Sequence, residues 1–452
     1  MEGSNNNISK PTCPCCVFMN HQDLFLPPPS LEDNDTIRGD QKKGEEEEDG
    51  VVVSPIEALK CLQDHARKLL QREDEAATIK APLLLVDTHN HAHLKRERHA
   101  SYITDLDSSS SDDGPVLSLV SLTLAVEESD WEDALQYAAT SVAENSHQQE
   151  QQQSHHTLMG LGIHPWYLEG VDPDDGSDWM AKLATLLQQH PSAIVGEIGL
   201  CKMAKCARSH PEGKTRGFEM QRQVLHQQFK LAIQYQRPVS IHCVQQHGVL
   251  LELLQEISIR AKEQIKTVQQ QQQQQQQRDN ETEANTTTSI SQFVPPAIAL
   301  HSFTGTAHHV KTLLQWEATL FGEGPNDRKK KKKHTSQKDD DNKDTATSST
   351  EGENENQPPK RKPLLYFGFS HIVNYEMCTS DKARRQGLEA VRAVPLDRLL
   401  AESDVHNPLD VPAGTAGAIA YMAHALQRSI PFVAERTAVN GLLFLQSHLN
   451  TS

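Results

Sequence analysis

The sequence predicts an α/β protein whose folded part is a (β/α)8 TIM barrel with long low-complexity insertions. Two observations support this fold: short apolar runs alternate with longer segments of helical spacing, and most of the runs end in residues that can bind metal. Strands buried on both faces of a parallel sheet are apolar throughout. Eight such strands alternating with helices are typical of a closed barrel. An open doubly wound sheet is the alternative, but no glycine-rich phosphate loop follows the first run.

The eight expected strands are short and bounded by turn residues. They are Leu83–Asp87, Val116–Val120, Leu158–His164, Ala193–Gly199, Pro238–His242, Ala297–His301, Leu364–Phe369 and Arg398–Glu402. Segments with helical spacing lie between most of them, among them Trp131–Ala143, Phe218–Gln236 and Val249–Lys262. The alternation continues from the first run to the last, as one barrel requires.

Other segments are too polar to bury a core. An acidic leader at 1–80 is expected to be disordered, apart from a short helical pattern near Pro55–Leu70, and so are insertions at about 262–296 and 322–363. The shorter stretches 105–114 and 144–156 are similar in composition. The barrel is therefore placed at 81–452, interrupted by these insertions. The net charge of -17 lies partly in the leader, so it says little about the substrate.

Location and partners are predicted from what the termini and insertions contain. Met1–Asn20 lacks the features of a signal peptide, and no apolar run approaches the roughly 20 residues that span a membrane. We expect an intracellular protein of the cytoplasm or nucleus, with no membrane association and with possible protein partners at the disordered segments. Two basic clusters, Arg328–Lys333 and Lys360–Lys362, indicate either a nuclear import signal or phosphate patch, or a solvated charge run. Cys13, Cys15 and Cys16 are either free thiols or a metal clip.

Candidate metal ligands follow the expected strands. His89 and His91 come after the first strand, and residues two apart in an extended chain point to the same side. Glu197 lies deep in the fourth strand, where a carboxylate is costly unless it is paired or binds metal. It is the best candidate for a bridging ligand, and a buried salt bridge is the alternative. Asp404 follows the eighth strand and can both ligate a metal ion and take a proton from water.

Three further strands contribute histidines. His242 and His301 follow the fifth and sixth runs, and His164 follows the third. His164 is expected to contact substrate phosphate or a metal-bound water, or else to pack at a turn. His93 and His371 are outer candidates. Four neutral imidazoles and two carboxylates suit one or two divalent ions such as Zn²⁺ or Mn²⁺. Two such ions lower the pKa of water and stabilise attacking and leaving oxygens, which fits phosphodiester hydrolysis.

Six motifs in order resemble the TatD family of metal-dependent deoxyribonucleases, whose barrels are amidohydrolase-like. The motifs are Asp87–His91, Gly162–Trp166, Gly196–Leu200, Ile241–Cys243, His301–Gly305 and Glu402–Asp404, and Asn440 and Phe444 are similar to the family's closing helix. The resemblance implies that His89, His91 and Asp404 hold one metal ion and that His242 and His301 hold the other, with Glu197 between them. It also implies DNA as the substrate, Zn, Mn or Mg as the metal, and exonuclease-type cleavage.

Two positions depart from the family pattern. Cys201 stands where the family usually has Asp, and Val244 stands where it usually has Arg. The sequence Ile241–Gln245 resembles a divergent branch that includes the fission-yeast cut9-interacting protein. Two alternatives therefore accompany the deoxyribonuclease: a metal-dependent hydrolase of another ester or amide, and a catalytically weak barrel that acts as a binding scaffold.

Overall fold

The computed structural model describes most of the barrel and little of the leader and insertions. The described residues are 52–71, 83–98, 117–146, 155–174, 176–279, 289–323 and 361–447. The chain divides into two units, 1–52 and 53–452, and the second contains the barrel. The cysteines at 13–16, the stretch 105–114 and the basic cluster Arg328–Lys333 lie outside the described residues.

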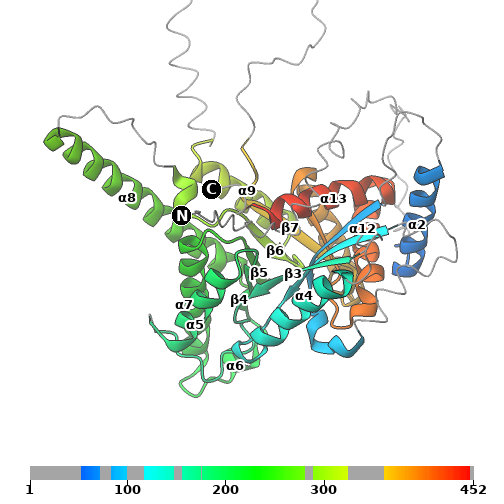
Figure 1. The fold of residues 1–452 in the computed structure, drawn as a ribbon, viewed down its shortest axis with the longest axis horizontal. Coiled ribbons are helices and arrows are strands. Elements are labelled where there is room, and N and C mark those ends of the chain that lie inside the picture. The colour runs from blue at the N-terminus through cyan, green and yellow to red at the C-terminus, as the bar shows by residue number, and fades with distance from the viewer. Residues whose placement is uncertain are drawn as a thin grey trace, which may run out of the picture. The chain divides into compact units, whose positions relative to one another are not determined.

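Eight parallel strands form one sheet in the order in which they occur in the chain (Figure 1). They are β1 (Leu83–Asn90), β2 (Leu117–Leu124), β3 (His155–Leu161), β4 (Ile194–Cys201), β5 (Val239–Val244), β6 (Ile298–His301), β7 (Leu365–Ser370) and β8 (Leu399–Glu402). The last strand lies beside the first: Thr88 Oγ1 donates to Ala401 O at 3.2 Å, and Asp404 N donates to His89 O at 3.0 Å. The predicted barrel is confirmed, and the open sheet is wrong.

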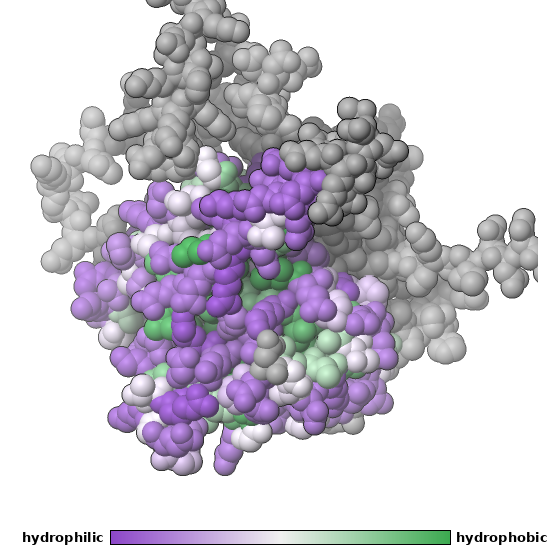
Figure 2. All heavy atoms as spheres, turned by 90° about the vertical axis from the view of Figure 1, so that its left-hand side faces the viewer, coloured by the Kyte–Doolittle hydropathy of each residue, from purple (hydrophilic) through white to green (hydrophobic). Residues whose placement is uncertain are grey.

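Helices surround this sheet. They are α2 (Pro55–Gln71), α4 (Trp131–Ser146), α5 (Asp178–Gln189), α6 (Lys205–Arg208), α7 (Lys214–Gln234), α8 (His247–Asp279), α9 (Ala307–Leu320), α11 (Asp381–Ala393), α12 (Val411–Leu426) and α13 (Ile430–Leu445). The view of the side that carries α7 and α8 is mostly hydrophilic, with scattered apolar side chains (Figure 2). Within the described ranges, no helix is both long and apolar enough to cross a membrane.

Burial follows from the position of the strands between the barrel interior and the helices. Every residue of β2, β4, β7 and β8 is buried. Strands covered on both faces cannot alternate polar and apolar residues, which explains why the runs read as continuously apolar. The polar residues that do occur in them, such as Glu197 and Glu402, need partners inside the protein.

The helical pattern expected near Pro55–Leu70 is confirmed as helix α2, whose Ala58 and Leu62 are buried against the barrel's outer helices. The domain boundary expected at residue 81 therefore left a packed helix in the leader, and two other expected boundaries also need correction. Helix α8 continues through the glutamine run to Asp279, well into the insertion expected to start at 262. Strand β3 begins at His155, inside the stretch 144–156. In each case local composition was outweighed by helix propensity or by tertiary packing, which polar composition does not reveal.

A buried carboxylate holds the two ends of the insertion that follows α9. Glu317 is 1% exposed and accepts hydrogen bonds from Leu364 N at 2.8 Å and from Arg361 at 2.9 Å. Arg398 also pairs with it. Arg361 belongs to the predicted basic cluster Lys360–Lys362 and is therefore engaged in an ion pair with the barrel. The bases of that cluster are not all free for a partner.

Candidate metal centre

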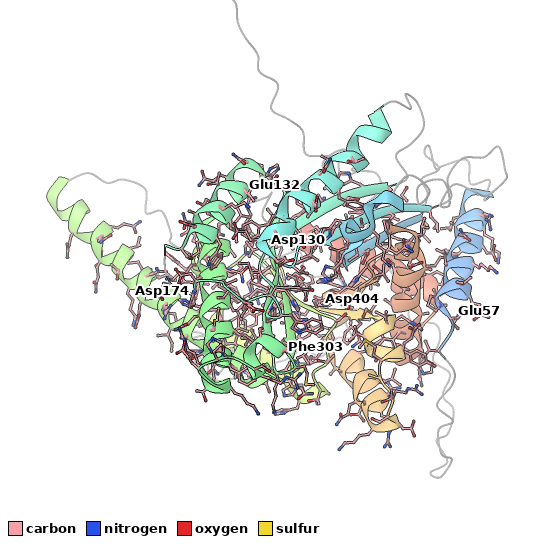
Figure 3. The ribbon with its side chains drawn as sticks, turned by 90° about the horizontal axis from the view of Figure 1, so that it is seen from below. Glu57, Asp130, Glu132, Asp174, Phe303 and Asp404 are labelled. Atoms are coloured by element: carbon pink, nitrogen blue, oxygen red, sulfur yellow. The ribbon has the colours of Figure 1, made fainter. Side chains whose placement is uncertain are left out.

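All seven predicted site residues lie together at the C-terminal end of the barrel. His89, His242 and His301 lie in β1, β5 and β6, Glu197 lies in β4, and His91, His164 and Asp404 follow β1, β3 and β8. Because the strands are parallel, their C-terminal ends meet on one face. Figure 3 shows Asp404 and Phe303 near the middle of the molecule, and Glu57 of α2 at its outer edge.

Glu197 is the centre of this cluster. Five histidines lie within 3.6 Å of its carboxylate: His89 and His91 face Oε2, and His164, His242 and His301 face Oε1. Burial raises the pKa of this carboxyl, but the surrounding imidazoles outweigh burial and hold its pKa well below the ordinary value. Glu197 is therefore an anion enclosed by groups that can carry or accept positive charge.

The first half of the centre joins His89, His91 and Glu197. His91 Nδ1 donates to Leu124 O at 2.8 Å, so the Nε2 of the neutral ring carries a lone pair. That Nε2 lies 3.3 Å from His89 Nε2 and 3.3 Å from Glu197 Oε2. His89 Nδ1 is in turn 3.2 Å from Ser240 Oγ. Three atoms that can each ligate a metal ion thus converge on one point.

The second half includes His301 and Asp404. His301 Nδ1 lies 3.2 Å from Glu402 Oε2, and its Nε2 lies 3.5 Å from Asp404 Oδ2. Glu402 also accepts Ser302 N at 2.7 Å. Burial lowers the pKa of His301, but Asp404, Glu197 and Glu402 outweigh burial and raise its pKa to about 10. A carboxylate on one ring nitrogen fixes the ring and increases its basicity toward a metal ion on the other.

His242 is held between Glu197 and Cys201. Its Nδ1 lies 3.1 Å from Glu197 Oε1. Burial lowers its pKa, but the contacts with Cys201 and Glu197 raise the pKa to about 9. The thiol of Cys201 also accepts a hydrogen bond from Trp166 Nε1 at 3.1 Å. Strands β4 and β5 approach each other closely here. A Cβ on Gly199 would lie 1.9 Å from His242 O, so only glycine fits at this position.

His164 contacts the same carboxylate as a neutral ring. Burial is the main effect that holds its pKa well below the ordinary value. Trp166 N donates to its Nδ1 at 3.3 Å, so the proton lies on Nε2, which is 3.5 Å from Glu197 Oε1. The ring nevertheless belongs, with Glu197 and His242, to one of the groups of residues that could hold a metal ion.

The donor atoms fit divalent metal ions. Three overlapping groups have ligand atoms within 4.8 Å of one another: His89, His91 and Glu197; His89, His301 and Asp404; His164, Glu197 and His242. Together they contain all six predicted ligands. Imidazole nitrogens mixed with carboxylate oxygens suit Zn²⁺, Mn²⁺ and similar ions. The donor set supports metal binding on its chemistry.

Two outer candidates have partners elsewhere. His93 Nε2 lies 3.1 Å from Asp130 Oδ2, and His371 Nδ1 lies 3.1 Å from Glu376 Oε1. Neither belongs to the groups that could hold metal. Sequence reasoning also missed Glu402, although a carboxylate inside an apolar strand is the same signal that identified Glu197.

The two departures from the family pattern are partners in the sheet. Cys201 and Val244 lie opposite each other in the register of β4 and β5. Both belong to an apolar cluster with Ala204 and Ala207. An uncharged pair therefore stands at the two positions where the resemblance implies opposite charges, and Val244 offers no cation to a substrate.

Comparisons with known proteins agree with the motifs. The model of the family described as TatD related DNase matches residues 86–337, more than half of the chain. The Cut9-interacting protein scn1 of Schizosaccharomyces pombe is 30% identical over 285 residues, which are 60% of this chain and 67% of that protein. The resemblance stated from the motifs is thereby confirmed.

Solved structures with some similarity are more distant. The TatD homologue YJJV of Escherichia coli has a TM-score of 0.45 and 17% identity, covering 80% of this chain and 97% of that chain. A TatD-family hydrolase of Entamoeba histolytica has a TM-score of 0.43 and 11% identity, covering 80% and 99%. An uncharacterized amidohydrolase of Saccharomyces cerevisiae has a TM-score of 0.41 and 11% identity, covering 79% and 98%.

Proposed function

The chain belongs to the TatD-related DNase family of metal-dependent hydrolases, and we propose that it cleaves phosphodiester bonds of DNA with one or two divalent ions at the Glu197 centre. The observation that carries the proposal is the convergence of five histidines on one buried carboxylate. In this proposal His89, His91 and Asp404 would hold one ion, His242 and His301 would hold the other, and Glu197 would serve as a ligand to both.

The proposed roles follow from the contacts of each side chain. Divalent ions at such a centre lower the pKa of water and polarise the phosphoryl group. Asp404 takes the proton of the attacking water on Oδ2, the oxygen that Ser302 Oγ orients at 3.0 Å. His164, a neutral ring with its proton on Nε2, donates to a phosphate oxygen. Glu197 supports the reaction together with Asp404, because its carboxylate contacts the histidines of the centre and so fixes their positions.

The test is a nuclease assay on the purified full chain. Labelled single-stranded DNA is incubated with Mn²⁺, Mg²⁺ or Zn²⁺, and products are separated by length. We expect cleavage that a chelator abolishes and that Glu197→Gln reduces below detection, because the anion that the histidines surround is removed. Glu252→Gln, on the outer helix α8, is the matched control. Cleavage that survives both the chelator and Glu197→Gln would disprove the proposal.

Two other functions have specific support. Val244 supplies no cation beside the centre, which favours a less charged ester or amide as substrate. A panel of carboxyl esters and amides, assayed with the same ions, distinguishes this possibility from DNA cleavage. The fission-yeast relative is named as an interacting protein, which favours a binding role. If a Glu197→Gln variant captured a protein partner as efficiently as wild type does, the binding role would be independent of catalysis.

A further inference from the structure

Helices α8 and α9 both begin on the face of the barrel that carries the metal centre. Helix α8 starts at His247, three residues after β5, and α9 starts at Ala307, six residues after β6. Both starts therefore lie at the C-terminal ends of the strands that carry His242 and His301. The first N–H groups of a helix have no carbonyl partner within it, and with the helix dipole they favour an anion. At the start of α9 one of these groups, His309 N, already donates to the side chain of Thr306.

His247 contributes a buried nitrogen that has no partner. Its side chain belongs to a residue only 7% exposed, and its Nε2 makes no hydrogen bond. The ring stacks on that of His309, in the first turn of α9, with centroids 4.6 Å apart and planes at 14°. The ring of Phe303 also packs edge-on against the His247 ring, with centroids 5.3 Å apart. A buried polar atom without a partner costs free energy, and it calls for a bound group.

His309 offers a donor with a defined tautomer. Thr306 N donates to its Nδ1 at 3.1 Å, so the proton of the neutral ring lies on Nε2. Burial lowers the pKa of His309, and burial together with His309 lowers the pKa of His247 to about 4. Near neutral pH both rings are therefore uncharged, so neither repels the other and an N–H remains for a ligand.

The first turn of α8 also leaves room. Outside its own helix and chain neighbours, no atom lies within 4 Å of the position that a Cβ on Gly248 would occupy. Side chains of a helix tilt toward its N-terminus, so this open space lies beside the free N–H groups. A side chain at this position would enter that space.

We propose that His247, His309 and the first turns of α8 and α9 form an anion site that binds a phosphate group. The inference rests on the proposed function, because this phosphate would be a neighbour of the one cleaved at the metal centre, in the same DNA strand. Phosphate oxygens accept several hydrogen bonds at once, which suits imidazole and helix N–H donors. The site would thus supply hydrogen bonds to a phosphate group, which the side chain of Val244 cannot donate.

The first experiment measures binding of inorganic phosphate to the full, metal-loaded chain by calorimetry. His309→Gln keeps a residue that can cap the helix at this position but removes Nε2. Gly248→Asp places a carboxylate in the open space, where the helix dipole tolerates it and the fold is kept. Both should weaken phosphate binding about tenfold, the effect of one hydrogen bond to a charged group. His226→Gln, on α7, is the control and should bind as wild type does.

Wild type and the three variants should all bind some phosphate at the metal ions. Only the difference in phosphate affinity between wild type and a variant therefore reports on the proposed site. Equal phosphate binding by wild type, His309→Gln and Gly248→Asp would overturn the proposal and would leave a water molecule as the partner of His247. Melting curves of each variant identify any loss of binding that is due to unfolding.

The second experiment uses two substrates. A dinucleotide has one phosphodiester, and a trinucleotide has a second phosphate for the anion site. We expect the ratio of kcat/KM for the trinucleotide to that for the dinucleotide to fall about tenfold in His309→Gln, with no change in the His226→Gln control. An unchanged ratio in His309→Gln would contradict the proposal. If neither substrate is cleaved by wild type, the proposed function fails, whereas calorimetry still decides the anion site.

Discussion

Asp404→Asn tests whether Asp404 acts as the general base. The residue has a left-handed backbone (φ 55), which Asn adopts more readily than most residues, so the backbone should be kept. Its Oδ2 accepts Ser302 Oγ at 3.0 Å and lies 3.5 Å from His301 Nε2, and an amide oxygen can preserve the first contact. The change therefore removes the charge and most of the basicity while it leaves the other five proposed ligands in place.

The expected magnitude is the loss of one general base. Turnover should fall about 10²-fold or more, which is a rise of roughly 2.7 kcal/mol in the barrier. KM should change little, because the interaction belongs to the transition state. The assay is steady-state kinetics at saturating Mn²⁺ on the substrate that the nuclease assay identifies. Asp410→Asn, an exposed carboxylate at the start of α12, is the matched control. Near-wild-type turnover with metal retained would refute the role of Asp404.

Three further predictions concern metal affinity, pH and the insertion. Glu402→Gln removes the charge beside His301 Nδ1, so metal affinity should fall about 10- to 100-fold in a chelator competition, and unchanged affinity would contradict this role. Burial lowers the pKa of His156 to about 4, so the unfolded chain takes up a proton first as pH falls below about 6.5. Wild type should therefore lose about 2 kcal/mol of unfolding free energy between pH 7 and pH 5 that His156→Gln does not lose, as urea denaturation can measure. Deleting residues 325–359 should leave the melting temperature nearly unchanged, whereas Glu317→Gln should cost about 3 kcal/mol, because two arginines lose their buried partner. A deletion that melts earlier than Glu317→Gln would show that the insertion stabilises the barrel.

The ligand set was predictable because three physical constraints coincide. Strands buried on both faces are apolar, so Glu197 stood out as a buried charge that needs partners. Parallel strands bring their C-terminal ends together, so residues as far apart in sequence as His89 and Asp404 were expected to meet. The structure brings all seven predicted residues together. Whether they bind metal stays a prediction.

The parts that could not be predicted depend on register and on tertiary contacts. Nothing local indicates that Leu124 O orients His91, or that Cys201 lies opposite Val244, because strand register is set by the whole sheet. The helical spacing of α2 was visible in the sequence, but its packing against the barrel was not. Its buried residues find their partners on α12, more than 300 positions away in the sequence. The pairing of His247 with His309 depends on where two helices begin, which is the least predictable feature of an element.

The measurement that tests the central claim most directly is the metal content of the purified full chain. Elemental analysis after mild purification should find at least one divalent transition ion per chain in wild type. The double variant His89→Ala/His91→Ala removes two of the nitrogens that converge on Glu197 and should lose most of that metal. The control His93→Ala/His371→Ala removes two histidines that pair outside the cluster and should retain it. Unchanged metal content in the His89/His91 variant would show that the metal lies elsewhere and would contradict the account of this site.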